Sequence, residues 1–268
     1  MSNKFESLKS KLKEVHNLNQ AASLLGWDQQ TYMPPGGAAA RAEQLSTLSK
    51  IAHEKFTSDE IGQLLADLAG ADFEYDSTEA SLVRVAQREY HKARKLPPDL
   101  VAEMSKTFAL AHEIWTKARA ESDFAQFRDT LAKIIDLNVQ AAEAYGYEDH
   151  IYDALLDLYE PGMKSAEVKA VFDELKGTLV PLVKSIADQQ DVVDDTVMHL
   201  DYDEQKQWDF GLLPLQAIGY DLKRGRQDKS THPFTTSFSV NDVRITTRVY
   251  KNELPTALFG TLHEGGHA

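Results

Sequence analysis

The spacing of apolar residues predicts a mainly α-helical chain. In the first segment an apolar residue recurs every three or four positions, which places all of them on one face of a helix reaching about Leu25. These residues are Phe5, Leu8, Leu12, Val15 and Leu18. Further helices are expected at about 38–56, 59–69, 76–96, 100–115, 127–145, 168–179 and 201–220. No Pro-, Gly- or Ser-rich linker separates them, so 1–268 is interpreted as part of a single helical domain.

Gly26–Gly37 is expected to interrupt this pattern as a loop, because it ends in a Pro-Pro-Gly-Gly sequence. Trp27, Tyr32 and Met33 in this loop either line a binding surface or fix the loop to the core. Elsewhere, capping boxes that begin at Asp76 and Asp201 are the predicted starts of two helices.

After about Lys223 the spacing of apolar residues changes from three or four positions to two. Residues 234–240 and 242–249 alternate apolar or aromatic with polar side chains, on either side of Asn241. We therefore predict two short antiparallel strands joined by a tight turn. A free strand edge in this position could hold an extended peptide, or the hairpin could simply cap the core.

The chain ends in His263-Glu264-Gly265-Gly266-His267 and one alanine, which is an HExxH arrangement. Residues i and i+4 of a helix project about 40° apart, so His263 and His267 can bind one metal ion. Glu264 projects about 100° from His263 and is the candidate base for a metal-activated water. Glycine costs about 1 kcal/mol in a helix interior, so Gly265 and Gly266 indicate a close approach by another segment or by substrate.

This chemistry is metal-assisted hydrolysis of an amide. Two neutral imidazoles and one carboxylate would leave a zinc position open for water, and Glu264 would take its proton and pass it to the leaving amine. Zincins place the third ligand after the motif, and nothing earlier in the chain marks a substitute. We therefore expect this chain alone to bind metal weakly and to be inactive.

Other polar residues give weaker signals. His232, in a His-Pro-Phe sequence, could donate to a substrate oxyanion or be structural. Arg244 could contact substrate, but Asp242 lies on the same strand face and could pair with it, which would make both part of the scaffold. Lys223–Arg226 is interpreted as a solvated loop more readily than as an anion site.

Composition excludes several other classes of protein. The net charge of −13 argues against a nucleic-acid partner, and the absence of cysteine excludes disulfides and thiol catalysis. No run of apolar residues is long enough to span a membrane, and the polar N-terminus is unlike a signal peptide. A cytoplasmic protein is the resulting expectation.

Several segments together resemble the carboxypeptidase Taq family of metallocarboxypeptidases. They include His232-Pro233-Phe234, the DxRxT pattern from Asp242 to Thr246, and the HExxH motif. Trp27–Pro34 and Tyr159–Met163 are also similar to the N-terminal half of that family. The resemblance therefore covers essentially the whole chain.

The resemblance implies a helical zincin-type peptidase with a deep substrate groove. Carried over by position, His263 and His267 bind the metal, Glu264 is the base, and His232 and the Asp242–Thr246 strand lie along the groove. The complete enzyme would be a cytoplasmic homodimer with one zinc ion per subunit (cobalt being the alternative), removing C-terminal residues from peptides. Family members continue beyond this point, so the chain is expected to be an N-terminal portion that stops within the active-site helix.

Two other interpretations stay open at this stage. One is a zincin endopeptidase or dipeptidase, which peptides with a blocked C-terminus would distinguish. The other is a non-catalytic helical scaffold or peptide-binding protein. The sequence does not determine the substrate preference or the residue that anchors a substrate carboxylate.

Overall fold

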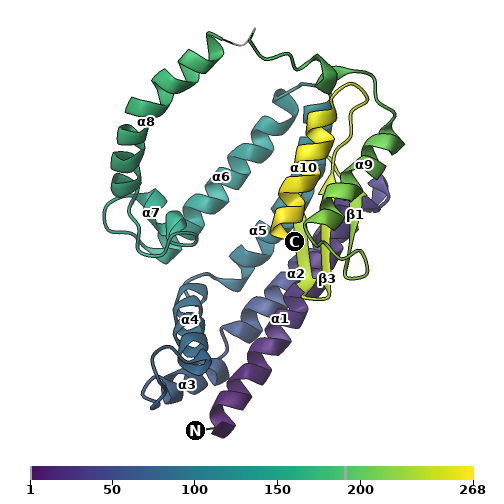
Figure 1. Cartoon of the computed structure of the whole chain (residues 1–268). Helices are drawn as coiled ribbons and strands as arrows, with labels where there is room; N and C mark the ends of the chain where they lie inside the picture. Colours follow the sequence, from purple (N-terminus) through teal and green to yellow (C-terminus); the bar gives the residue numbers. More distant parts are fainter. Residues whose placement is uncertain (1, 190–191) are drawn as a thin grey trace. The chain divides into compact units, whose positions relative to one another are not determined.

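The computed structural model describes residues 2–189 and 192–268 and is mainly helical, as predicted (Figure 1). The helices are α1 (Ser2–Thr31), α2 (Ala38–Phe56), α3 (Asp59–Leu68), α4 (Thr78–Ala93), α5 (Pro98–Ala120), α6 (Ala125–Tyr145), α7 (Ile151–Leu156), α8 (Ser165–Ala187), α9 (Glu204–Ala217) and α10 (Leu254–His267). The strands are β1 (Gly225–Lys229), β2 (Thr235–Ser239) and β3 (Asp242–Thr247).

The chain divides into two compact units. The first comprises the residues up to Gly26 together with Pro34–Ser165, and the second comprises Trp27–Met33 together with Ala166–Ala268. Helix α1 therefore contributes its last turns to the second unit. That the chain is part of a single metallopeptidase domain stays a prediction.

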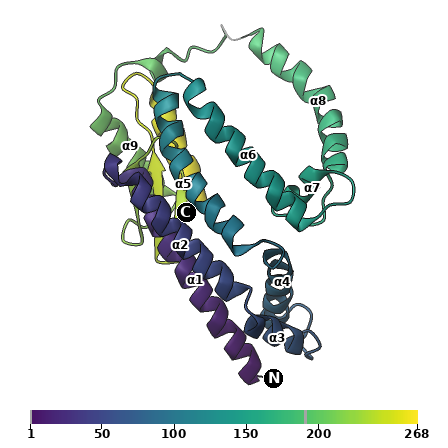
Figure 2. The same ribbon diagram turned by 180° about the vertical axis from the view of Figure 1, so that it is seen from behind.

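The first unit is helical throughout. Its core is formed by α1, α3 and α4, and the predicted apolar face of α1 supplies part of it. The fully or largely buried members are Phe5, Leu8, Val15, Ile61, Leu65, Leu68, Val83, Ala86 and Tyr90. Helix α5 packs against both α2 and α6 (Figure 2).

Helix α1 does not end near Leu25, as the sequence predicted, but continues through Gly26 to Thr31. A glycine in a helix costs about 1 kcal/mol, and burial of the next residue offsets that cost. The Trp27 side chain is only 7% exposed. Tertiary packing of Trp27 thus outweighs the local preference of Gly26.

Two predicted helix starts were each displaced by one or two residues. Ser77 and not Asp76 caps α4, because the Ser77 hydroxyl accepts a hydrogen bond from the backbone N–H of Ala80. Asp203 and not Asp201 caps α9, accepting from the N–H of Lys206. The short helix α7 had no predicted counterpart. A capping box identifies the neighbourhood of a helix start but leaves neighbouring polar residues in competition.

The second unit contains a three-stranded sheet in the order β1-β3-β2, and not the two-stranded hairpin that the sequence predicted. β2 and β3 form the expected antiparallel pair around Asn241, with an irregularity between Ser237 and Ser239. β1 is additional and pairs in parallel with β3. Its polar sequence, Gly-Arg-Gln-Asp-Lys, carries no alternating pattern, so the polar 223–226 segment was wrongly interpreted as a loop from Gly225 onward.

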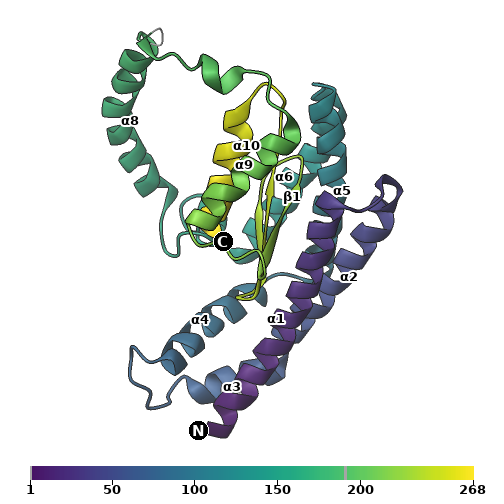
Figure 3. The same ribbon diagram turned by 45° about the vertical axis from the view of Figure 1, so that its right-hand side comes forward.

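The two faces of this sheet meet different helices. Ile245, which is fully buried, and Thr247 face α10, where the Thr247 hydroxyl donates to the Ala257 carbonyl. Arg244 points to the opposite face, where Trp27 lies. Helices α9 and α10 pack side by side (Figure 3). Alternation along β3 thus separates a helix-covered face from a face bound to the end of α1.

Candidate functional site

His263 and His267 lie one turn apart on α10, both exposed, with their Nε2 atoms 3.3 Å from each other. Their rings are nearly perpendicular and their centroids are 4.8 Å apart. Two nitrogens that each lie about 2.0–2.1 Å from a tetrahedral zinc ion are separated by about 3.3–3.4 Å. The spacing of these two nitrogens therefore fits two ligands of one such ion.

Within the described part of the chain, no third candidate ligand lies beside them. Among residues 2–189 and 192–268, no group of three or more His, Asp or Glu side chains is placed to hold a metal ion. Glu264 is not part of such a group although it lies next to His263 in sequence. Helix α10 thus places two imidazoles side by side, and their role as metal ligands stays a prediction.

Glu264 points toward the sheet and is 6% exposed. Its Oε2 atom accepts a 2.6 Å hydrogen bond from the hydroxyl of Thr235, the first residue of β2. That hydroxyl also lies 3.0 Å from the Glu264 carbonyl oxygen. One strand residue therefore holds both the side chain and the backbone of the predicted base.

Thr235 had no predicted role in the site. The two-residue alternation predicted that it lies in a strand, but that strand position lies 28 positions before the first residue of the HExxH motif, and no sequence pattern connects them. The only available signal was that Thr235 directly follows His232-Pro233-Phe234. Its contact depends on the packing of α10 against the sheet.

The two glycines of the motif have different surroundings. A Cβ atom on Gly265 would lie 2.4 Å from Cδ2 of Leu215, a fully buried residue of α9. A Cβ atom on Gly266 would meet nothing within 4 Å. Close approach of another segment, as predicted, is thus confirmed for Gly265, where that segment is α9.

Strand β2 lies at one edge of the sheet and pairs on one side only, with β3, within the described part of the chain. Thr235 on this strand reaches Glu264, so the open edge begins beside the predicted base. This is the geometry in which an extended peptide can add to a sheet by main-chain hydrogen bonds. Peptide binding at this edge stays a prediction.

Arg244 forms two 2.8 Å hydrogen bonds to the Asp242 carboxylate. Its guanidinium also lies 4.4 Å from the centre of the Trp27 ring and 4.8 Å from that of Phe238. Hydrogen bonding by Arg244 keeps the pKa of Asp242 below its usual value. The predicted pairing of these two residues is confirmed; a substrate contact by Arg244 stays a prediction.

The end of α1 is fixed to the sheet by a second arginine. Arg226 of β1 donates to the Asp228 carboxylate and, at 2.7 Å, to the Tyr32 hydroxyl. The Tyr32 hydroxyl in turn donates to Asp228, and this hydrogen bond raises the pKa of Tyr32. Buried Trp27 and the hydroxyl of Tyr32 thus anchor the segment, which matches the structural one of the two roles considered for it.

His232 is exposed in the connection between β1 and β2. Its carbonyl oxygen accepts a 2.7 Å hydrogen bond from the Ser230 hydroxyl. The structure does not bring its side chain into the contact between Thr235 and Glu264. Its proposed role toward substrate is therefore not tested by this geometry.

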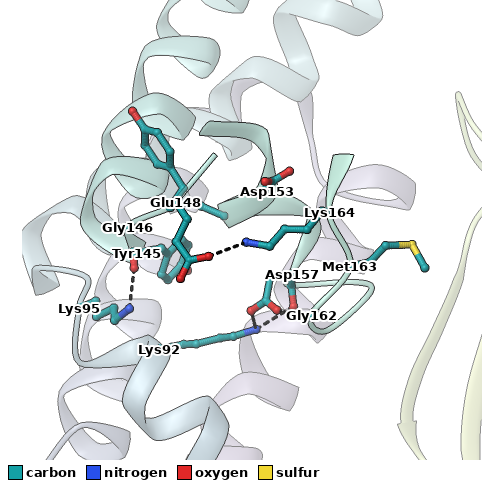
Figure 4. A pocket seen from close by; sticks show the side chains of 12 residues that line it. Lys92, Lys95, Tyr145, Gly146, Glu148, Asp153, Asp157, Gly162, Met163 and Lys164 are labelled. Atoms are coloured by element: carbon teal, nitrogen blue, oxygen red, sulfur yellow. Dashed lines mark hydrogen bonds and ion pairs between the residues drawn. The ribbon is translucent and has the colours of Figure 1, made fainter. Parts of the chain in front are cut away.

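The first unit has a cavity of about 230 Å³ between the ends of α4, α6 and α7 (Figure 4). Lys92 pairs with Asp157 and Lys164 pairs with Glu148 at its lining, and the Lys95 ammonium donates to the carbonyl oxygen of Tyr145. None of the five predicted site residues lines it. The cavity and the HExxH helix are thus separate features, each within its own unit.

Comparison with known proteins decides the family. The model of the family "Carboxypeptidase Taq (M32) metallopeptidase" matches residues 7–268. The chain belongs to the M32 carboxypeptidase family. This agrees with the resemblance carried by the HPF, DxRxT and HExxH segments.

Individual M32 relatives match almost all of this chain. Carboxypeptidase 1 of Bacillus subtilis is 35% identical over 96% of this chain and 51% of its own length. Thermostable carboxypeptidase 1 of Pyrococcus furiosus is 37% identical over 97% of this chain and 52% of its own length. The crystal structure of BsuCP superposes with a TM-score of 0.94 and 34% identity, covering 99% of this chain and 54% of that one. The chain therefore spans about half the length of the relatives it matches.

None of the described helices combines the length and apolar character that a membrane-spanning helix needs.

Proposed function

We propose that this chain carries two metal ligands and the general base of an M32 metallocarboxypeptidase. The 3.3 Å separation of His263 Nε2 and His267 Nε2 is the observation that carries the proposal, because it suits two ligands of one tetrahedral ion. Membership of the M32 family supports a divalent metal and a peptide substrate. Zinc is the proposed ion, with cobalt as the alternative and one ion per subunit.

When bound, the metal would supply a Lewis acid that polarises the substrate carbonyl and lowers the pKa of water to about 7. Glu264 would accept the proton from that water and pass it to the leaving amine. The Thr235 hydroxyl would keep the carboxylate in one orientation through its 2.6 Å hydrogen bond. The open edge of β2 would align the substrate backbone beside Glu264.

Metal titration tests the ligand assignment. Zinc added to the 268-residue chain should bind more weakly than micromolar, because two exposed imidazoles without a third ligand form an incomplete site. His263→Ala or His267→Ala should remove this binding, whereas His232→Ala should leave it unchanged. Zinc binding that survives both substitutions on α10 would show that the ligands lie elsewhere.

Peptidase activity is proposed for the complete fold and not for this chain alone. The decisive protein is residues 1–268 joined to the second half of Carboxypeptidase 1 of Bacillus subtilis, whose own length this chain matches over 51%. This fused protein should release C-terminal amino acids from peptides, and Glu264→Gln should abolish release while zinc binding persists. The 268-residue chain should release none.

Blocked substrates separate the remaining reaction classes. A carboxypeptidase should leave peptides with an amidated C-terminus intact, whereas an endopeptidase should cleave them internally. A folded, zinc-loaded fused protein that cleaves neither kind of peptide would favour a non-catalytic peptide-binding role.

Substrate contacts and assembly complete the proposal. His232 and Arg244 are proposed to contact substrate, and their substitution should then raise KM more than it lowers kcat. A cytoplasmic location and a homodimer are proposed for the complete enzyme.

A further inference from the structure

The cavity of the first unit is lined by equal numbers of opposite charges. Within the described part of the chain, three lysines and three carboxylates belong to its lining, and all of them lie in that one unit. They are Lys92, Lys95, Lys164, Glu148, Asp153 and Asp157. A lining of this composition complements a ligand that carries both signs of charge and no net charge.

Four of these six charges are paired with each other. The Lys92 ammonium lies 2.5 Å from the Asp157 carboxylate and also donates to the Asp157 carbonyl oxygen. The Lys164 ammonium lies 3.4 Å from the Glu148 carboxylate. These pairs leave one lysine and one carboxylate of the lining.

The remaining carboxylate is Asp153 of α7, which is only 5% exposed. Its Oδ1 atom accepts a 2.7 Å hydrogen bond from the backbone N–H of Ser165. Its Oδ2 atom is buried, and no residue in 2–189 or 192–268 donates a hydrogen bond to it. Hydrogen bonding from Ser165, aided by the charge of Lys164, lowers the pKa of Asp153, so the carboxylate stays ionised at neutral pH. A buried anionic oxygen without a donor is costly, and a cationic ligand group in the cavity would offset that cost.

The remaining lysine is Lys95, which follows α4 and is exposed. Its ammonium donates to the carbonyl oxygen of Tyr145 and forms no ion pair within the described part of the chain. An ammonium has three donors, so Lys95 keeps two for a ligand. Figure 4 shows Lys95 and Asp153 on different elements of the lining, the turn after α4 and helix α7. A cationic and an anionic group thus line one cavity from two elements.

We propose that this cavity binds a free α-amino acid, with its ammonium group on Asp153 and its carboxylate on Lys95. The cavity volume of about 230 Å³ is below the roughly 300 Å³ at which sites for drug-sized ligands begin. It corresponds to about seven or eight water molecules of about 30 Å³ each, which is room for one amino acid of medium size. Ala154 and Met163 add an apolar part to the lining that suits an aliphatic side chain.

Ligands with a single sign of charge suit the cavity less well. An inorganic anion would lie beside buried Asp153, and a simple amine would lie beside Lys95. Free amino acids are also what the proposed carboxypeptidase would release. A role in sensing that product rests on the proposed function, whereas binding of an amino acid at this cavity does not.

Methionine signals in nuclear magnetic resonance spectra can locate the binding. The chain has five methionines, of which Met163 lines the cavity and Met198 lies in the second unit. The 268-residue chain, isotope-labelled at its methionine methyl groups, is titrated with L-leucine in the presence of a metal chelator. The Met163 signal should shift with a Kd of about 0.1–1 mM, the range expected for a ligand of so few atoms. The Met198 signal should stay in place.

Two leucine derivatives test the need for both charges. L-leucine amide lacks the carboxylate, and N-acetyl-L-leucine lacks the ammonium group. Each should bind at least about tenfold more weakly than L-leucine. Inorganic phosphate should leave the Met163 signal in place.

Two substitutions test the assigned residues. Asp153→Asn removes the charge but keeps an oxygen that accepts from the Ser165 N–H. Lys95→Gln removes the charge but keeps a donor for the Tyr145 carbonyl. Each should weaken L-leucine binding at least about tenfold while the variant still unfolds cooperatively.

Lys50→Gln and Asp99→Asn are the matched controls, because these two residues pair with each other outside the cavity. Both variants should bind L-leucine like the unsubstituted chain. His263→Ala should also bind it unchanged, which separates this proposal from the metal assignment.

Three outcomes would overturn the proposal. In the first, L-leucine at millimolar concentration leaves the Met163 signal in place. In the second, L-leucine amide, N-acetyl-L-leucine or phosphate shifts that signal as effectively as L-leucine, which would assign the cavity to a simple cation or anion. In the third, the folded Asp153→Asn and Lys95→Gln variants both bind L-leucine unchanged.

Discussion

The Thr235 hydroxyl lies 2.6 Å from Glu264 Oε2 and connects the first residue of β2 to the predicted base on α10. Glu264 is 6% exposed, so its carboxylate depends on protein donors more than on water. The same hydroxyl lies 3.0 Å from the Glu264 carbonyl oxygen. This strand residue therefore fixes the orientation of the last turn of α10 as well as that of the side chain.

Thr235→Val should destabilise the chain by about 1–3 kcal/mol, because it removes the donor to a buried carboxylate while conserving side-chain shape. The free energy of unfolding from urea denaturation measures the effect. Thr235→Ser is the matched control and should recover most of the loss, since it retains the hydroxyl. Equal stability of the valine and serine variants would show that the hydrogen bond contributes nothing.

Gly265→Ala should destabilise the chain by about 1–3 kcal/mol, the usual cost of overpacking a filled core. Its Cβ atom would come within 2.4 Å of Leu215 Cδ2 and 3.3 Å of Ile218 Cδ1, both on the α9 side. Gly266→Ala is the control one residue away, where space is open. It should stabilise α10 by up to about 1 kcal/mol through helix propensity. Loss of stability in both variants would indicate a general intolerance of α10 to alanine.

Tyr220 should make stability depend on alkaline pH. Burial raises the pKa of its hydroxyl to about 12 from an ordinary value of 10.0. Because the folded-state pKa is raised, the stabilising contribution is complete below about pH 10 and is lost as pH rises through about 12. The hydroxyl donates to the Val243 carbonyl at 2.7 Å.

Tyr220→Phe measures this contribution by subtraction. Near neutral pH the variant should be about 1 kcal/mol less stable, the usual net value of one hydrogen bond. The difference between the two proteins should shrink between pH 10 and pH 12, as followed by thermal unfolding across that range. A difference that is constant over this interval would contradict the raised pKa.

Arg244→Lys should cost about 1–2 kcal/mol, because lysine cannot reproduce the two-pronged pairing with Asp242 or the stacking on Trp27. Arg224→Lys is the control, because the Arg224 side chain is largely exposed and its ion pair with Asp221 is long, with 3.5 Å between Nε and Oδ2. That change should stay within about 0.5 kcal/mol.

The same pair predicts a response to acid. The folded-state pKa of Asp242 is lowered by hydrogen bonding from Arg244, so its contribution is present above the ordinary value of 3.8 and is lost as pH falls below it. Arg244→Lys should therefore weaken the fall in stability below about pH 4. An unchanged acid profile in that variant would rule out this assignment.

Local sequence patterns were sufficient to predict most of the helices. The three- and four-residue spacing of Phe5, Leu8 and Val15 correctly identified a buried helix face, because that spacing follows from the geometry of a single helix. Local patterns also predicted that the first helix ends near Leu25 and that Lys223–Arg226 is a solvated loop. Both errors arise where long-range contacts outweigh local preference: burial of Trp27 in one case, and parallel pairing with β3 in the other.

The sequence by itself determined the family and the residues of the HExxH motif, because histidine spacing on one helix and ordered short motifs are local properties. Only the tertiary structure decided that Thr235 holds Glu264 and that Gly265 is required by α9. Only the tertiary structure also decided that Arg244 stacks on Trp27. These contacts join residues that are distant along the chain, so they follow from packing and not from local spacing.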